Sequence, residues 1–268
     1  MLYKTYLCNL LAARGYTCYL GSKANISYLM ASFHDYLYLD KGYHMGVSDR
    51  LYEMIELQGG RIINLDEEGA IDYSDHSTLA GRYSKQLFDK SSLVLFWGQQ
   101  QRDLVPEPYY RDTRTAVTGH PRFELLKEQH QYLYADEVNR LHRRYSNFIL
   151  INTNMGFGNN IRGDEFVRSN YGPRFKQIDR IIEFDKQKLQ TYIELVRALA
   201  KQSSKQIVLR PHPEESREVY EQAFSDLTEV DVVFEGSVVP WLIAADLMIH
   251  PDCTTALESY FIGKIPLS

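Results

Sequence analysis

The sequence predicts an α/β fold with two parallel β-sheets. Short apolar runs of strand composition alternate with stretches of helical periodicity along the chain, and this alternation is typical of parallel sheets. A polar stretch at residues 127–142 separates two such alternations. The length of 268 residues suits two domains of about 120 to 150 residues each. We therefore expect a first domain at 1–126, linker helices at 127–146 and a second domain at 147–268.

The first alternation begins with a helix, because apolar residues recur at helical spacing from Leu2 until Arg14 and Gly15. Ser48 is the predicted N-cap of a later helix that ends at residues 59–60. Apolar runs predict five strands, at residues 16–20, 36–39, 61–65, 92–96 and 115–117, and further helices at 23–33 and 78–88.

The second alternation begins with the apolar run at 148–152. Residues 152–171 are expected to be irregular, and long loops of this sort are usually functional or disordered. A helix is predicted at 186–201, and strands at 206–209, 231–234 and 247–249. The last strand stops at His250 and Pro251, because proline cannot continue a ladder, and a helical pattern then runs to Gly263.

Composition narrows the classes of function. A net charge of −5 does not predict affinity for nucleic acid or for an anionic membrane. Three cysteines cannot form a closed set of disulfides, so we expect a reducing cytoplasm. No apolar run approaches the roughly 20 residues of a membrane helix. Metal-ligand spacings and the GxxxxGK[ST], GxGxxG and GxSxG motifs are missing from the sequence, so we expect no metal and no cofactor.

Three adjacent carboxylates, Asp66, Glu67 and Glu68, follow the predicted strand at 61–65 and precede Gly69. Like charges this close resist ionising together, so one of them is expected to have a raised pKa suited to a general base. The alternative interpretation is a solvated loop that caps the next helix.

Two prolines fix the backbone around His212 in the segment Arg210-Pro211-His212-Pro213. An imidazole held at the end of a strand can donate to a phosphate, or protonate one as it leaves. A rigid turn with a structural histidine explains the same residues, and composition does not decide between the two.

Hydroxyl side chains begin the helix that follows the last strand. Free N–H groups and the helix dipole at Thr254 and Thr255 favour an anion. Glu258 lies on the same helix face as Thr254, so a phosphate at the helix start and a ribose or base contact from Glu258 are compatible. N-capping by Asp252 or Thr254 is the alternative. A similar turn at residues 118–122 is interpreted as a capping turn.

Segments spread in order over nearly the whole chain resemble bacterial surface carbohydrate biosynthesis proteins. These segments are residues 11–15, 20–22, 38–42, 65–69, 97–98, 118–122, 149–154, 210–213 and 250–258. The resemblance implies a glycosyltransferase-like protein with two facing Rossmann-like domains, the GT-B arrangement, that acts in capsule or lipopolysaccharide assembly. It implies a nucleotide-activated sugar donor, a glycan or glycolipid acceptor, no nucleic acid partner and at most peripheral association with a membrane.

A looser similarity connects the chain to bacterial sialyltransferases and some Kdo transferases. Those enzymes carry an acidic D/E-D/E-G motif that supplies the base, then an HP motif and a Ser/Thr pair that hold the phosphate of a CMP-sugar. The similarity implies that Glu67, or Asp66 in another register, is the base, with Glu68 beside it. It implies nucleotide or phosphate contacts from Arg210, His212, Pro213, His250, Thr254, Thr255 and Glu258. Further residues expected to line the cleft are Gly69, Gly119, His120, Asn152 and Asn154.

The chain departs from the family at both ends. We expect a shortened protein, because the opening strand of the first domain and the final strand and helices of the second lie outside this sequence. A UDP-sugar epimerase or hydrolase is an alternative function. A non-catalytic relic that binds a nucleotide-sugar is another.

Overall fold

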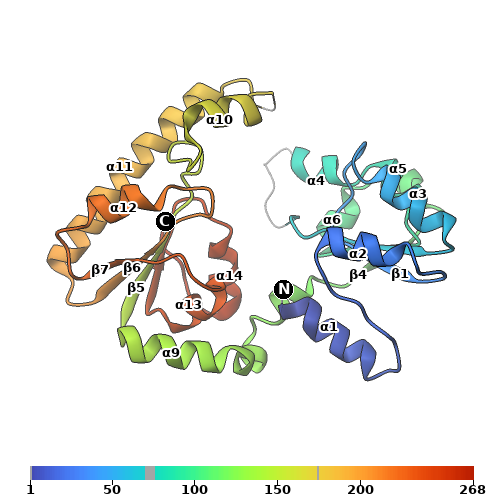
Figure 1. The fold of residues 1–268 in the computed structure, drawn as a ribbon, viewed down its shortest axis with the longest axis horizontal. Coiled ribbons are helices and arrows are strands. Elements are labelled where there is room, and N and C mark those ends of the chain that lie inside the picture. The colour runs from blue at the N-terminus through green and yellow to red at the C-terminus, as the bar shows by residue number, and fades with distance from the viewer. Residues whose placement is uncertain (1, 70–75, 174) are drawn as a thin grey trace. The chain divides into compact units, whose positions relative to one another are not determined.

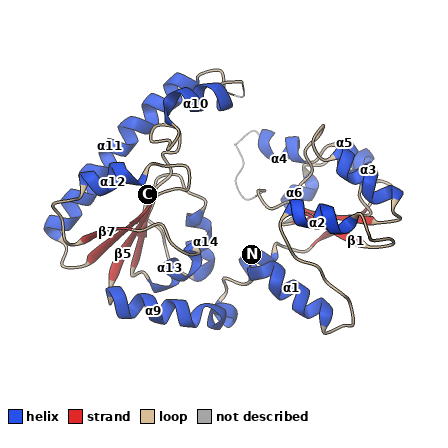
Figure 2. Cartoon of the chain, in the orientation of Figure 1, coloured by secondary structure: helices blue, strands red, loops and turns tan. Residues whose placement is uncertain are grey.

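The computed structural model describes residues 2–69, 76–173 and 175–268. The chain divides into two compact units, Met1–Leu125 and Leu126–Ser268. Each unit contains a four-stranded parallel sheet with helices packed around it (Figure 1). Figure 2 separates the strands of both sheets from the surrounding helices by colour. The predicted α/β fold with two parallel sheets is therefore confirmed.

The first unit has the strand order β1-β2-β3-β4. The strands are β1 (Leu37–Asp40), β2 (Arg61–Leu65), β3 (Leu93–Phe96) and β4 (Arg114–Val117). Its helices are α1 (Leu2–Ala12), α2 (Lys23–Met30), α3 (Asp49–Leu57), α4 (Ser77–Arg82), α5 (Lys85–Lys90), α6 (Gln99–Asp103), α7 (Glu107–Tyr110) and α8 (Pro121–Glu124). Tyr52, Phe88 and Phe96 are the largest side chains of its core. Because the strands are parallel, the loops that follow them share one edge of the sheet.

The second unit has the strand order β7-β6-β5-β8. The strands are β5 (Phe148–Asn152), β6 (Gln206–Arg210), β7 (Val230–Val232) and β8 (Leu247–Ile249). Its helices are the 3₁₀ helix η1 (Glu128–Tyr134), α9 (Ala135–Tyr145), α10 (Gly163–Tyr171), α11 (Ile178–Gln202), α12 (Arg217–Ala223), α13 (Val238–Ala244) and α14 (Thr255–Ile262).

Side chains of β5 alternate between two cores. Phe148 and Leu150 pack with Trp241 of α13 and with residues of α9. Ile149 and Ile151 pack on the other face with residues of α11 and α12. A strand covered on both faces is buried along its whole length, which explains the continuous apolar sequence of β5. Residues 127–146, expected to link two domains, form η1 and α9, and α9 packs into the core of the second unit.

Three elements differ from the sequence prediction. Residues 16–20 form no strand, and Tyr16 and Tyr19 are 60% and 57% exposed, because an apolar alternation becomes a strand only where a neighbouring strand completes its hydrogen bonds. The helix expected at 78–88 is divided into α4 and α5, since Ser84 is extended and its side chain caps α5. The irregular segment expected at 152–171 contains α10.

Candidate functional site

The acidic loop of the first unit begins where β2 ends. Asp66 is 3% exposed and its carboxylate lies 3.1 Å from Nη1 of Arg82. Arg82 also binds Glu68 through Nη2 at 2.9 Å, and the backbone N–H of Glu68 donates to Asp66 Oδ1 at 2.6 Å. Arg82 therefore neutralises two of the three predicted acids, and their like charges are compensated where they lie.

Glu67 is held by the first turn of α1. The hydroxyl of Tyr3 donates to Glu67 Oε1, and Nζ of Lys4 lies 2.6 Å from the same oxygen. Burial raises the pKa of the Glu67 carboxyl, but hydrogen bonds from Lys4 and Tyr3 and the charges of Lys4 and Lys41 outweigh it, and the pKa is lowered overall. The expectation of a raised pKa in this loop is therefore wrong for Glu67, because the opposite charges come from residues distant in the sequence.

His120 lies beside the acidic loop, at the start of α8. It is 5% exposed, its ring centre is 4.6 Å from that of Trp97, and burial lowers its pKa to about 4. Nδ1 accepts the backbone N–H of Arg122 at 3.1 Å, so the neutral ring carries its proton on Nε2. That bond is the N-cap of α8, as interpreted from the sequence. The preceding Gly119 has φ +74, a conformation that favours glycine.

Sequence reasoning missed Gln101 of α6. This side chain is 5% exposed and accepts the N–H of Trp97 at 2.8 Å while donating to the carbonyl of Gly69 at 2.9 Å. Trp97 in turn donates from Nε1 to the carbonyl of Asp66 at 2.6 Å. Gln101 and Trp97 thus fasten the acidic loop to the end of β3. A run of three glutamines at residues 99–101 gives no sign of which one is buried.

Strands β5, β6 and β8 of the second unit end at one edge of its sheet. Asn152 pairs with Arg210 in the β5–β6 register, and Ile151 pairs with Ile249 across β5 and β8. The loops that carry the predicted phosphate-binding residues therefore emerge side by side.

Two asparagines bind the segment that leads into α14. Asn152 Nδ2 donates to Thr255 Oγ1 at 3.0 Å, and Asn154 Nδ2 donates to the carbonyl of Asp252 at 3.2 Å. Asp252 has φ +40, which L side chains rarely adopt, so the Asn154 contact supports a strained turn. Lys188 of α11 also reaches the Asp252 carboxylate at 3.4 Å.

Two histidines at this edge have the same tautomer. His212 Nδ1 accepts the backbone N–H of Glu214 at 3.3 Å, and His250 Nδ1 accepts that of Cys253 at 3.2 Å. Both neutral rings therefore carry the proton on Nε2, which can donate to an anion. Burial lowers the pKa of His250, although the charge of Asp252 acts in the opposite direction.

Glu215 was also missed from the sequence. It is 2% exposed and its Oε1 accepts the hydroxyl of Thr153 at 2.9 Å and the backbone N–H groups of Met155 and His212 at 3.0 and 3.1 Å. Oε2 accepts the hydroxyl of Tyr220. One buried carboxylate therefore joins the loop after β5 to the loop that carries His212. Its position next to Glu214 is the only sequence signal, and it does not distinguish the buried acid from the exposed one.

Among the other predicted site residues of the second unit, one is bound to backbone carbonyls, two are exposed and one is buried. Nη1 and Nη2 of Arg210 donate to the carbonyls of Glu235 and Gly236 at 2.6 and 3.1 Å, and burial lowers its pKa to about 10. Pro213 and Thr254 are exposed, and Thr254 makes no side-chain capping bond to α14. Glu258 is 2% exposed in α14. Arg210 thus binds the loop after β7. At the start of α14 the N–H groups of Ala256 and Leu257 donate to the backbone carbonyls of Cys253 and Thr254, at 3.0 and 3.1 Å.

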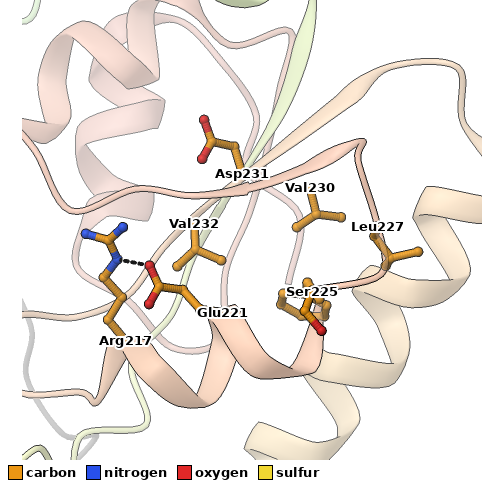
Figure 3. Close-up of a pocket in the computed structure, with 8 residues that line it drawn as sticks. Arg217, Glu221, Ser225, Leu227, Val230, Asp231 and Val232 are labelled. Carbon is orange, nitrogen blue, oxygen red and sulfur yellow. Dashed lines mark ion pairs between the residues drawn. The ribbon is translucent and has the colours of Figure 1, made fainter.

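A surface hollow of about 290 Å³ lies elsewhere in the second unit, between α12 and β7. Arg217 and Glu221 form an ion pair of 2.6 Å at its side. Figure 3 shows this pair with Val232 and Val230 above it in the view. No predicted site residue lines it. Across residues 2–69, 76–173 and 175–268, no three potential metal ligands cluster, and none of the helices has the length and apolarity to cross a membrane.

No protein-family model and no curated protein matches the sequence. Solved structures of similar fold do match the chain. The UDP-GlcNAc 2-epimerase from Methanocaldococcus jannaschii has a TM-score of 0.53 at 10% identity, over 92% of this chain and 66% of that one. UDP-N-acetylglucosamine 2-epimerase from Rickettsia bellii gives 0.49 at 12% identity, over 91% and 59%. The pneumococcal O-GlcNAc transferase GtfA, in complex with UDP and GlcNAc, gives 0.43 at 12% identity, over 93% and 45%.

These likenesses are of fold alone, since identity is 10% to 12%. The chain is an α/β protein with a two-domain, GT-B-like fold, as the sequence predicted. It spans 66% of the length of the archaeal epimerase and less of the other two.

Proposed function

We propose that the protein is a glycosyltransferase of bacterial surface polysaccharide assembly, which transfers a sugar from a nucleotide-activated donor, preferably CMP-linked, to a glycan or glycolipid. The observation that carries the proposal is the pair of Nε2–H donors, His212 and His250, at the sheet edge where α14 begins. Crevices at the carboxyl ends of parallel strands are the usual ligand sites of such sheets.

The donor phosphate fits this edge of the second unit. The dipole of α14 favours an anion at the helix start, where the Thr254 side chain makes no capping bond. The N–H groups of Ala256 and Leu257 donate to the carbonyls of Cys253 and Thr254. Asn152 holds Thr255 at the helix start. Both imidazoles can donate to phosphate oxygens and so stabilise the nucleotide as it departs.

Glu67 is the proposed base. The carboxylate takes the proton of the acceptor hydroxyl while the hydroxyl oxygen attacks the anomeric carbon and the bond from that carbon to the phosphate breaks, which inverts the configuration. Asp66 is less suited, because Arg82 and the Glu68 N–H bind its carboxylate. The donors to Glu67 both bind Oε1, and Oε2 takes no hydrogen bond from the described residues.

The preference for CMP follows from the order of the motifs, acidic, then HP, then the hydroxyl pair, in which they resemble those of sialyltransferases and Kdo transferases. The role in capsule or lipopolysaccharide assembly follows from the resemblance of segments over nearly the whole chain to bacterial surface carbohydrate biosynthesis proteins. The proposed location is the cytoplasm, where nucleotide-sugars are available to such enzymes.

Saturation-transfer NMR with CMP and with UDP tests the proposal. We expect binding of CMP in preference to UDP, and loss of that binding in a His212→Ala, His250→Ala double variant. Preference for UDP would favour a UDP-sugar epimerase or hydrolase instead. Absence of binding by either nucleotide would point to a non-catalytic protein and remove the donor site.

A further inference from the structure

Glu67 is fixed by side chains from the beginning of the chain. We propose that Tyr3 and Lys4 are positioning residues that anchor Glu67 by its Oε1 and leave Oε2 directed to the acceptor hydroxyl. This inference rests on the proposed function, in which Glu67 is the base. It adds two residues that no motif of the sequence indicates.

The contacts themselves show the anchoring. Tyr3 is 9% exposed, and its ring packs edge-on against His120 with ring centres 5.3 Å apart. From that fixed ring the hydroxyl reaches Glu67 Oε1, while Lys4 reaches the same atom at 2.6 Å. Two donors on one oxygen fix the carboxylate, so the rotamer of Glu67 is determined by α1 as well as by its own loop.

The first turn of α1 is its most buried part. Tyr3 is its one buried residue among those described, and Leu2 and Leu10 are 38% and 41% exposed. A helix held by core packing would bury its apolar side chains instead. The buried side chain of α1 thus lies in its first turn, and that turn is where the bonds to Glu67 are made.

Two cations and one neutral ring lie around Glu67. Lys4 comes from α1 and Lys41 from the loop after β1, and His120, at the start of α8, interacts with the Glu67 charge. The neighbouring acids Asp66 and Glu68 are paired with Arg82. With these donors and cations the carboxyl has a lowered pKa and stays ionised at neutral pH. The contacts of Tyr3 and Lys4 thus make the Glu67 carboxylate a weaker base, but they fix its geometry and keep it ionised.

The test is a titration of Glu67 by carboxyl ¹³C NMR, with the signal identified by its loss in Glu67→Gln. In Lys4→Met and in Tyr3→Phe we expect the pKa of Glu67 to rise by about one unit, because an opposite charge or a donor is removed. Lys4→Arg should restore the original value. Lys85→Met and Tyr36→Phe are matched controls, since these residues bind Asp89 and Gln58 and should leave Glu67 unchanged.

The second measurement is CMP release from CMP-sialic acid and CMP-Kdo as a function of pH. We expect kcat in Lys4→Met and Tyr3→Phe to fall about tenfold, with KM for the donor unchanged and the acid limb moved to higher pH. Lys4→Arg should recover most of the rate. A purely structural role would lower thermal stability without moving the acid limb.

The outcomes separate the two proposals. An unchanged pKa of Glu67 in Tyr3→Phe, which keeps the buried ring, overturns the anchoring whatever the activity. A shifted pKa with unaltered kcat also overturns the positioning role. Glu67→Gln could also retain full activity while Lys4→Met and Tyr3→Phe shift the pKa of Glu67. In that case the contacts with Tyr3 and Lys4 are confirmed, and the assignment of Glu67 as the base is wrong.

Discussion

Glu67 combines partial burial with two donors on a single oxygen, and the chemistry proposed for the protein depends on its carboxylate. Replacing Glu67 by Gln keeps the shape but removes proton acceptance. We expect transfer to fall by about 10²- to 10⁴-fold, the contribution typical of a general base, with CMP binding intact. Radiolabelled sugar transfer and saturation-transfer NMR measure the two properties. Glu56→Gln, an exposed acid on α3, is the matched control. Full activity in Glu67→Gln would remove the residue from the mechanism.

Glu215 joins the loop after β5 to the loop that carries His212 in the second unit. Glu215→Ala leaves the Thr153 hydroxyl and the Met155 and His212 N–H groups without their acceptor in a buried place. We expect the free energy of unfolding to fall by about 3 kcal/mol, since unsatisfied buried donors are costly. Urea unfolding measures this. Glu221→Ala, which breaks only the exposed pair with Arg217, should cost less than about 1 kcal/mol. Equal losses in both variants would contradict the role assigned to Glu215.

At the scale of elements, the loop after β5 packs directly on α11. A Cβ added to Gly158 would lie 2.5 Å from the backbone nitrogen of Lys186 and 2.7 Å from the Asp185 carbonyl carbon, closer than atoms can approach. Neither atom can move without displacing α11. We expect Gly158→Ala to destabilise the protein by about 2 kcal/mol, within the range for overpacking. Thermal unfolding would report it.

Gly98→Ala is the control for Gly158→Ala, because nothing lies within 4 Å of its added Cβ and its φ of −158 suits any residue. A Gly158→Ala protein as stable as Gly98→Ala would mean that the loop and α11 separate readily in solution.

Most elements were predictable because their signals are local. Apolar periodicity placed β2, β3, β5, β6 and β8, and Gly263, with φ +95, ended α14 as expected. The segment at 16–20 has the same kind of signal but no neighbouring strand. A ladder partner is a property of the fold, so periodicity alone cannot supply it.

The site was predictable only in part for the same reason. Motif spacing predicted Glu67, His212 and Thr255 as site residues, and these lie after the ends of strands or at the start of a helix. Partners of two of them come from far along the chain: Tyr3 is 64 residues from Glu67, and Asn152 is 103 from Thr255. The lowered pKa of Glu67 follows from such partners, so Glu67 is not the acid with the raised pKa that the sequence predicted for one of the three.

At the scale of the whole molecule, each unit has a core of its own, and His120 belongs to the first. Burial lowers the pKa of His120 from 6.5 to about 4, so between these values the unfolded chain binds a proton that the folded unit does not. Stability contributed by the neutral ring is therefore present above pH 6.5 and is lost as the pH falls towards 4. By linkage, acidification from pH 8 to pH 5 should cost the first unit about 2 kcal/mol.

Hydrogen exchange followed by mass spectrometry can measure this pH dependence separately in the two units. We expect peptides of the first unit to lose protection at pH 5, after correction for the intrinsic exchange rate, by more than those of the second. His120→Phe should reduce the difference, because a ring without a titratable nitrogen removes the linkage, whereas His34→Gln, an exposed histidine, should not. The same loss in wild type and His120→Phe would show that another group of the first unit binds the proton, and that His120 is not what makes this unit sensitive to acid.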